Sequence, residues 1–226
     1  MGKISIDFNS QFLLDYDYYL KGLDLQNWYR YYFIIKEIVK FRPKNILEIG
    51  TGNEIVKNCL SKLIKDYKVM DINSKLKPDI ISDLGEFHRE LTEKFSCIIC
   101  ADVLEHTPFG DLEKNLTNIY NYLDKKGKTL ITIPHRRINF IFLNSFSPHK
   151  PHFFALPSWF CLTPRAFYSR FIKKETQKDP YHCWEIGDGK VKRKDVESFI
   201  RKAGFKIDTF MQLFYVDLWV LKKKTY

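Results

Sequence analysis

Acidic residues stand in or directly after apolar runs in the first half of this sequence: Glu48, Asp71, Asp83 and Asp102. If these runs are parallel strands, their carboxyl ends meet at one end of a sheet, and the acids then surround one slot. Carboxylates in such a slot would accept hydrogen bonds from a ribose diol, an exocyclic amine and an ammonium group. The same negative charge would disfavour a phosphate-rich ligand.

The run from Asn45 to Gly52 is typical of a buried strand that breaks into a tight turn. Glycine at positions 50 and 52 would let the backbone turn and let a ligand approach it closely. A dinucleotide fingerprint would continue with glycine or alanine at position 55, where this chain has Ile55. The turn therefore indicates a ligand site that is not one for NAD, although a purely structural glycine turn is the alternative.

These residues must be positioned by alternating strands and helices, a pattern that predicts a parallel sheet covered on both faces. Strands are expected at 45–49, 67–71, 78–82, 95–101 and 128–133. Helices are expected at 26–41, 53–66, 85–93, 112–123 and 194–203, the fourth closed by Lys-Lys-Gly at 125–127. In the first of them, Trp28, Tyr32, Ile35 and Val39 form the expected buried face. Strands 205–210 and 213–221 would close the fold as an antiparallel hairpin.

Length and composition favour a single domain, 1–226, with a structured insertion or lid at about 135–190 and a possible helix from Pro164 to Lys173. The chain has 226 residues, 45% of them hydrophobic, and a formal net charge of +10. Because the lysines are scattered, a solvated surface is favoured over a nucleic-acid interface. No apolar run approaches the length of a membrane span, and five cysteines in no disulfide pattern fit a reducing compartment, so a cytoplasmic location is expected.

Three stretches together resemble the class I S-adenosylmethionine-dependent methyltransferases. Ile46–Asn53 is similar to the first motif of that family, Val69–Asn73 with Lys77–Leu84 to its second and third strand ends, and Phe95–His106 to its fourth-strand motif. The resemblance spans residues 27–134 and 191–221. It implies an α/β, Rossmann-like fold whose seven-stranded, mostly parallel sheet has the order 3-2-1-4-5-7-6, with strand 7 antiparallel. One departure is Glu54, where many members of the family have a third glycine.

The resemblance also implies roles for single residues toward the cofactor S-adenosylmethionine. Gly50 and Gly52 would let the backbone approach its methionine part, and Glu48 would orient the turn or the ammonium group. The other implied contacts are Asp71 with the ribose, Ile72 with the adenine face, Asp83 and Leu84 with the adenine edge, Asp102 and Val103 closing the site, and His106 near the sulfonium. For Asp83 and Asp102, capping of a helix N-terminus remains an alternative role. For His106, the alternative is simple packing or capping.

The methyl acceptor would lie against residues after the fifth strand and in the insertion. Candidate catalytic residues are His135, His182 and Glu185, and the last two stand in Tyr181–Gly187, which resembles a His-x-Trp-Glu-Ile-Gly element of some bacterial and archaeal methyltransferases. His182 would act as base or orient the acceptor; alternatively, His182 and Glu185 only fasten the lid. No metal site is expected, because Cys97 and Cys100 would point to opposite faces of one strand.

The sequence thus predicts an S-adenosylmethionine-dependent methyltransferase for a small-molecule or lipid- or sugar-linked acceptor, with methylation on oxygen. An RNA methyltransferase that uses the positive charge is one alternative. A non-catalytic protein that binds S-adenosylmethionine is another. A peripheral membrane contact is also open, because the apolar residues 140–143 follow Arg136 and Arg137.

Overall fold

The computed structural model describes residues 23–136, 138–142, 152–156, 168 and 181–224. The strands are β1 (Asn45–Ile49), β2 (Asp66–Asp71), β3 (Ile80–Ile81), β4 (Phe95–Ala101), β5 (Leu123–Pro134), β6 (Ile138–Phe142), β7 (His152–Leu156), β8 (Phe205–Gln212) and β9 (Val216–Lys223). The α-helices are α3 (Leu25–Phe41), α4 (Ile55–Leu60), α5 (Leu112–Tyr122) and α7 (Arg193–Lys202). Short 3-10 helices are η1 (Ser74–Leu76), η2 (Arg89–Leu91), η3 (Leu104–His106) and η4 (Phe109–Asp111).

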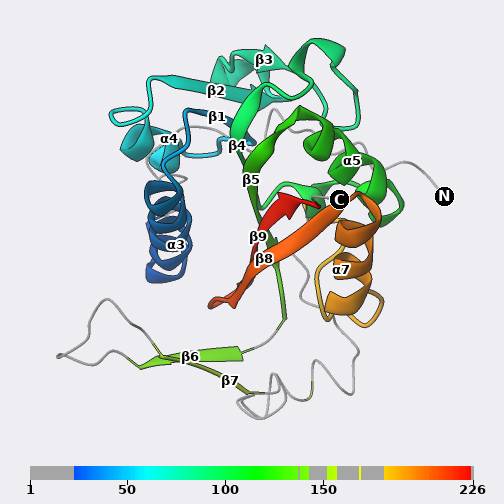
Figure 1. Cartoon of the computed structure of the whole chain (residues 1–226). Helices are drawn as coiled ribbons and strands as arrows, with labels where there is room; N and C mark the ends of the chain where they lie inside the picture. Colours follow the sequence, from blue (N-terminus) through cyan, green and yellow to red (C-terminus); the bar gives the residue numbers. More distant parts are fainter. Residues whose placement is uncertain (1–22, 137, 143–151, 157–167, 169–180, 225–226) are drawn as a thin grey trace.

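Seven strands form one sheet in the order β3-β2-β1-β4-β5-β9-β8 (Figure 1). The pairs from β3 to β5 are parallel, whereas β9 runs antiparallel to both β5 and β8. Since β8 and β9 are the sixth and seventh strands of this sheet along the chain, the predicted order 3-2-1-4-5-7-6 with an antiparallel seventh strand is confirmed. The carboxyl ends of β1, β2 and β4 therefore meet at one end of the sheet, as expected.

Helices cover both faces of the sheet, with α3 and α4 on one side and α5 and α7 on the other (Figure 1). Each face has its own buried cluster, and β4 contributes to both because its side chains alternate. Cys97 packs in the α3/α4 cluster and Cys100 in the α5/α7 cluster. Both thiols are buried and free, as the sequence predicted.

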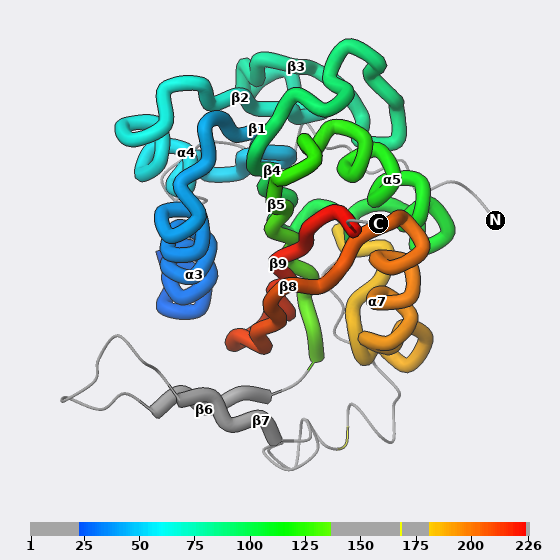
Figure 2. The backbone as a smooth tube through the Cα atoms, viewed as in Figure 1, coloured from blue at the N-terminus to red at the C-terminus, as the bar shows by residue number. Residues whose placement is uncertain are grey.

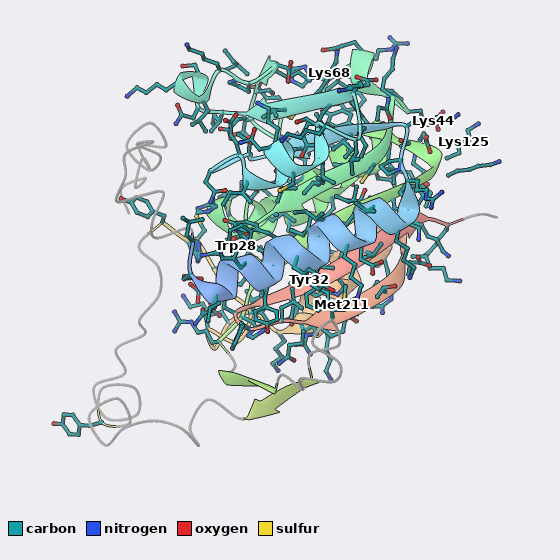
Figure 3. The ribbon with its side chains drawn as sticks, turned by 90° about the vertical axis from the view of Figure 1, so that its left-hand side faces the viewer. Trp28, Tyr32, Lys44, Lys68, Lys125 and Met211 are labelled. Atoms are coloured by element: carbon teal, nitrogen blue, oxygen red, sulfur yellow. The ribbon has the colours of Figure 1, made fainter. Side chains whose placement is uncertain are left out.

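Helix α3 begins where the Asp24 side chain accepts a hydrogen bond from the Asn27 amide, and it ends before Pro43, as predicted. Its buried residues are Tyr31, Phe33, Ile34 and Ile38. The predicted stripe was wrong: Trp28, Tyr32 and Val39 are 44%, 39% and 45% exposed. Apolar residues occupy most sides of this helix, so spacing alone does not select the buried one. Figure 3 shows α3 lying across the sheet, with Trp28 and Tyr32 labelled along it.

Four predictions about where elements lie or end were wrong. The expected helix at 85–93 is only the 3-10 turn η2, because Phe87 and Leu91 are too few apolar residues for a helical stripe. Instead, Phe87 stacks on Tyr122, with ring centroids 5.9 Å apart. Helix α4 ends at Leu60, well before residue 66, and α5 passes directly into β5, so the Lys-Lys-Gly at 125–127 lies inside a strand. The final turn lies at 213–215 rather than at 211–212.

In the predicted insertion, β6 and β7 pair antiparallel as a separate two-stranded sheet. In the main sheet, β9 lies between β5 and β8, as the coloured backbone in Figure 2 shows. The expected helix from Pro164 to Lys173 lies outside the described residues, Tyr168 excepted. Among the described residues, no helix combines the length and apolar character that crossing a bilayer requires.

Candidate active site

The turn after β1 depends on backbone that only glycine adopts easily. Gly50 has φ +73°, and a Cβ at this position would lie 2.3 Å from Cγ2 of Val103, the second residue after β4. Gly52 has φ +53°, and nothing lies within 4 Å of where its Cβ would be. Glu54, at the position of the family's third glycine, has φ 58° and forms an ion pair with Lys57. The turn thus packs tightly against the end of β4 and leaves open space at its tip.

Glu48 lies beneath this turn, on the α3/α4 face of β1, and is 4% exposed. Its carboxylate accepts hydrogen bonds from the hydroxyls of Tyr67 (2.8 Å) and Thr51 (3.4 Å). Burial raises the pKa of Glu48 to about 7, although these hydrogen bonds favour the charged form. Glu48 was predicted to orient either the turn or the ammonium group of the cofactor. Its hydrogen bonds to Tyr67 and Thr51 fit the first of these roles.

Replacing Glu48 with glutamine should stabilise the fold in a pH-dependent way. Because folding raises the pKa of this acid, the folded state binds its proton more tightly, and the native protein loses stability as pH rises from about 4.5 to about 7. Glu48→Gln removes that loss, which amounts to at most about 3 kcal/mol. Urea unfolding at pH 5 and pH 8 should give a larger gain at pH 8. A gain that is equal at both pH values would contradict this assignment.

The ends of β2 and β3 supply the next candidate residues. Asp71 is half-buried and accepts a hydrogen bond from the Asn73 amide (2.8 Å); burial raises its pKa, while backbone hydrogen bonds oppose the shift. Ile72 is 44% exposed, so an apolar surface stands beside this carboxylate. Asp83 accepts from the Gly85 amide (2.7 Å), and the adjacent Leu84 is buried. These four residues follow two paired strands and lie at the same end of the sheet.

Asp102 is held by three other elements. Its carboxylate accepts hydrogen bonds from Arg30 Nη1 of α3, from the Thr132 hydroxyl of β5 (2.6 Å) and from the Tyr215 hydroxyl in the β8–β9 turn (3.1 Å). Burial alone would lower the pKa of Arg30, but the charge of Asp102 outweighs it and raises that pKa further above neutrality. Asp102 is therefore neither a helix cap nor a solvated carboxylate. The sequence analysis missed Arg30, Thr132 and Tyr215.

Directly after Val103, the short helix η3 is bound to residues 181–186 of the distant insertion. The Cys183 amide donates to the Glu105 carbonyl (2.7 Å), and the Trp184 indole donates to the Thr107 carbonyl (3.0 Å). Further along, the Ile186 amide donates to the Pro134 carbonyl (3.0 Å). This segment is thus fixed beside the carboxyl ends of β4 and β5.

This docking brings together Glu105, His106, His182 and Glu185. His182 Nδ1 lies 2.9 Å from Glu185, whose other oxygen accepts from Arg136 (2.8 Å). Burial opposes ionisation of Glu185, but these two hydrogen bonds outweigh it and lower its pKa to about 2. Glu105 is fully buried, and burial together with the charge of Asp102 raises its pKa well above the usual range. The sequence analysis named three of these four residues and missed Glu105.

His135 lies apart from this cluster. Its side chain is buried, with Nε2 3.1 Å from the Leu213 carbonyl and 3.9 Å from Asp217. Asp217 in turn accepts from Arg193 (2.7 Å). His135 therefore joins β5 to the β8–β9 turn, and the structure gives it no place beside His182 as a second candidate base. Arg136, which was considered for a membrane contact, is instead paired with Glu185 and is largely buried.

A pocket opens beside the cluster, where residues 183–191 face η4. It is lined by Phe109, Arg136, Cys183, Trp184, Asp188, Lys190 and Val191. Arg136 Nη2 is buried and has no hydrogen-bond partner among the described residues. The pocket therefore combines aromatic walls with two cationic side chains, Arg136 and Lys190, and one acid, Asp188.

Comparison with known proteins agrees with this architecture. Residues 26–208 match the model of a family described as methyltransferase domain. A search of curated proteins finds no match.

Among solved structures, an S-adenosylmethionine-dependent methyltransferase from Clostridium acetobutylicum is similar, with a TM-score of 0.60, 13% identity and coverage of 93% of this chain and 96% of the other. The N-methyltransferase NodS from Bradyrhizobium japonicum, in complex with S-adenosyl-L-homocysteine, has a TM-score of 0.60, 13% identity and coverage of 96% of both chains. The 1,6-didemethyltoxoflavin-N1-methyltransferase of Burkholderia thailandensis, with bound substrate and S-adenosylhomocysteine, has a TM-score of 0.53, 10% identity and coverage of 92% and 85%. The chain therefore belongs to the methyltransferase domain family, and its fold is that of the S-adenosylmethionine-dependent methyltransferases.

Proposed function

We propose that this protein transfers a methyl group from S-adenosylmethionine to a hydroxyl group of a small, lipid-linked or sugar-linked acceptor. The observation that carries the proposal is the cluster of Glu105, His106, His182 and Glu185, which stands two residues beyond the Val103 that packs against the glycine turn. A cofactor slot and a group of proton-accepting side chains are thus neighbours.

The residues around the turn fit the cofactor. Gly52 leaves open space for its methionine part, and Asp71 offers a carboxylate for the ribose diol next to the exposed Ile72, which would lie against the adenine. Asp83 and Leu84 would bound the adenine edge. Val103 and Asp102 would close the site on the side of β4.

When bound, S-adenosylmethionine supplies a methyl group on a sulfonium, whose sulfur leaves with the electron pair of the broken bond. The chain's own task is to hold the acceptor in line with that bond and to exclude water. A neutral amine needs no further help, whereas a hydroxyl reacts better once its proton is removed. Two histidines beside the slot, one of them oriented by Glu185, therefore favour an oxygen acceptor.

The pocket that Arg136 and Lys190 line fits the rest of such an acceptor. Because Arg136 Nη2 is buried without a partner among the described residues, an oxygen-rich or anionic group in the pocket would satisfy it. Phe109 and Trp184 would contact an apolar or sugar ring. These properties suit phosphate-bearing sugar or lipid intermediates.

The test is incubation of the full chain with methyl-labelled S-adenosylmethionine and cell extract, with and without ribonuclease. Label should enter a ribonuclease-resistant small-molecule or lipid fraction. In calorimetry, Asp71→Ala should weaken S-adenosylhomocysteine binding about tenfold, a loss of about 1.4 kcal/mol. Asp208→Asn is the matched control, because Asp208 pairs with Lys128 near the opposite end of β5. Label in RNA would favour the RNA methyltransferase, and cofactor binding without any transfer would favour the non-catalytic protein.

A further inference from the structure

Glu105 is a buried acid that lacks, among the described residues, the contacts that such a group usually has. It is 0% exposed, and neither carboxylate oxygen has a hydrogen-bond partner among the described residues. Asp102, three residues earlier in the chain, adds negative charge near it. A buried carboxylate normally pairs with a cation or receives several hydrogen bonds. Among the described residues, Glu105 therefore lacks a cation in direct contact, although the charge of Arg30 acts on it.

Two histidines face the same point. One ligand atom each from Glu105, His106 and His182 lies within 4.8 Å of the others, and His182 Nε2 is 4.0 Å from Glu105 Oε1. The two imidazole rings meet edge to face, with centroids 4.9 Å apart. The three residues come from η3 and from the segment that main-chain hydrogen bonds fasten to it, so their proximity is built into the fold.

The second nitrogen of each histidine is already engaged. His106 Nδ1 lies 3.1 Å from the Tyr181 carbonyl, which can only accept, so Nδ1 carries the proton there. His182 Nδ1 lies 2.9 Å from one oxygen of Glu185, whose other oxygen accepts from Arg136, so this nitrogen donates as well. In both rings the lone pair is then on Nε2. Histidines that bind metals are oriented in this way by a carbonyl or carboxylate behind them.

From these contacts we propose that Glu105, His106 and His182 bind one divalent transition-metal ion, with Glu185 and Arg136 orienting His182 from behind. Two imidazoles and one carboxylate suit Zn²⁺, Co²⁺ or Mn²⁺ better than Mg²⁺ or Ca²⁺, which prefer oxygen ligands. Bonds of about 2.0–2.2 Å require the ligand atoms to move closer by roughly 1 Å. The ion would supply the positive charge that Glu105 lacks.

This site deepens the proposed function and rests on it for its role. Three protein ligands leave further positions of the ion open to an acceptor hydroxyl. The ion would lower the pKa of that hydroxyl so that its proton passes to water, and His182 would act as a ligand rather than as the base. Removal of the metal should then slow methyl transfer without changing cofactor affinity.

The experiment is titration of the chelator-treated full chain with Co²⁺, followed by its visible absorption bands, and with Zn²⁺ by calorimetry. One ion per chain should bind. Glu105→Gln and His182→Ala should each weaken binding at least 100-fold, and Glu105→Gln should raise the Tm of the metal-free protein because a neutral amide costs less to bury there than a carboxyl group that can ionise. His88→Asn is the matched control, since His88 also pairs with a glutamate, Glu90, but outside the cluster.

The proposal is overturned if no ion binds, or if both variants bind it as tightly as the original chain does. The metal titration contains no cofactor, so the two proposals fail separately. A chain that binds S-adenosylhomocysteine but no metal ion would contradict the metal site alone. A chain that binds Co²⁺ at this cluster but shows no affinity for S-adenosylhomocysteine would contradict the proposed function and still support the metal site.

Discussion

Gly50→Ala is expected to lower the free energy of unfolding by about 2–5 kcal/mol and to weaken cofactor binding at least tenfold. The loss of stability is the sum of a backbone cost and a steric cost. Alanine at φ +73° costs about 1–2 kcal/mol, and its Cβ would lie 2.3 Å from Cγ2 of Val103, so that side chain must move at a further cost of about 1–3 kcal/mol. Urea unfolding and S-adenosylhomocysteine calorimetry measure the two effects.

Two further variants separate these terms. Gly52→Ala introduces alanine at φ +53° into open space, so it should show the backbone cost alone, about 1–2 kcal/mol. Adding Val103→Ala to Gly50→Ala should recover part of the steric cost but none of the backbone cost. If Gly50→Ala and Gly52→Ala destabilise the protein equally, the close approach of Gly50 to Val103 costs no measurable free energy. The described geometry between the turn and Val103 would then be wrong.

The sheet could be predicted from the sequence because buried parallel strands are short apolar runs that end in polar residues. The run at 95–101 is β4 to the residue, and the acids that follow β2 and β4 lie at one end of the sheet. Side chains that point to alternate faces of a strand obey a fixed period, so the separation of Cys97 and Cys100 could also be predicted. Strand positions and the alternation of side chains could be predicted because both depend only on residues that are close in the sequence.

The rest depended on contacts between distant parts of the chain. Arg30 and Asp102 are 72 residues apart, and Tyr215 is 113 residues from Asp102, so no spacing in the sequence marks their network. Glu105 stands in a stretch that resembles a family motif, yet its burial arises only when residues 181–186 dock on η3. The buried stripe of α3 was mispredicted for a related reason, because tertiary packing selected among several apolar faces.

Arg30→Met should be the second severe substitution, with a loss of about 3 kcal/mol. Removing one partner of a largely buried ion pair leaves the other charge without compensation, and the side chains of Arg30 and Asp102 are only 13% and 17% exposed. Tyr215→Phe should be milder, because it removes only the neutral hydroxyl that hydrogen-bonds Asp102 and Asn27, at a cost of about 1–2 kcal/mol. Urea unfolding of each variant gives the comparison.

A double-mutant cycle decides whether charge is the cause. Asp102→Asn alone leaves the Arg30 guanidinium buried without its ion-pair partner, whereas Arg30→Met combined with Asp102→Asn leaves no charge at all. The double variant should therefore lose less stability than the two single variants added together, by at least 1 kcal/mol. Strict additivity would mean that the pairing of Arg30 with Asp102 contributes no interaction energy. Since Asp102 precedes the Val103 that packs on the glycine turn, a coupled result would also explain how α3, remote in sequence, fixes the shape of the cofactor slot.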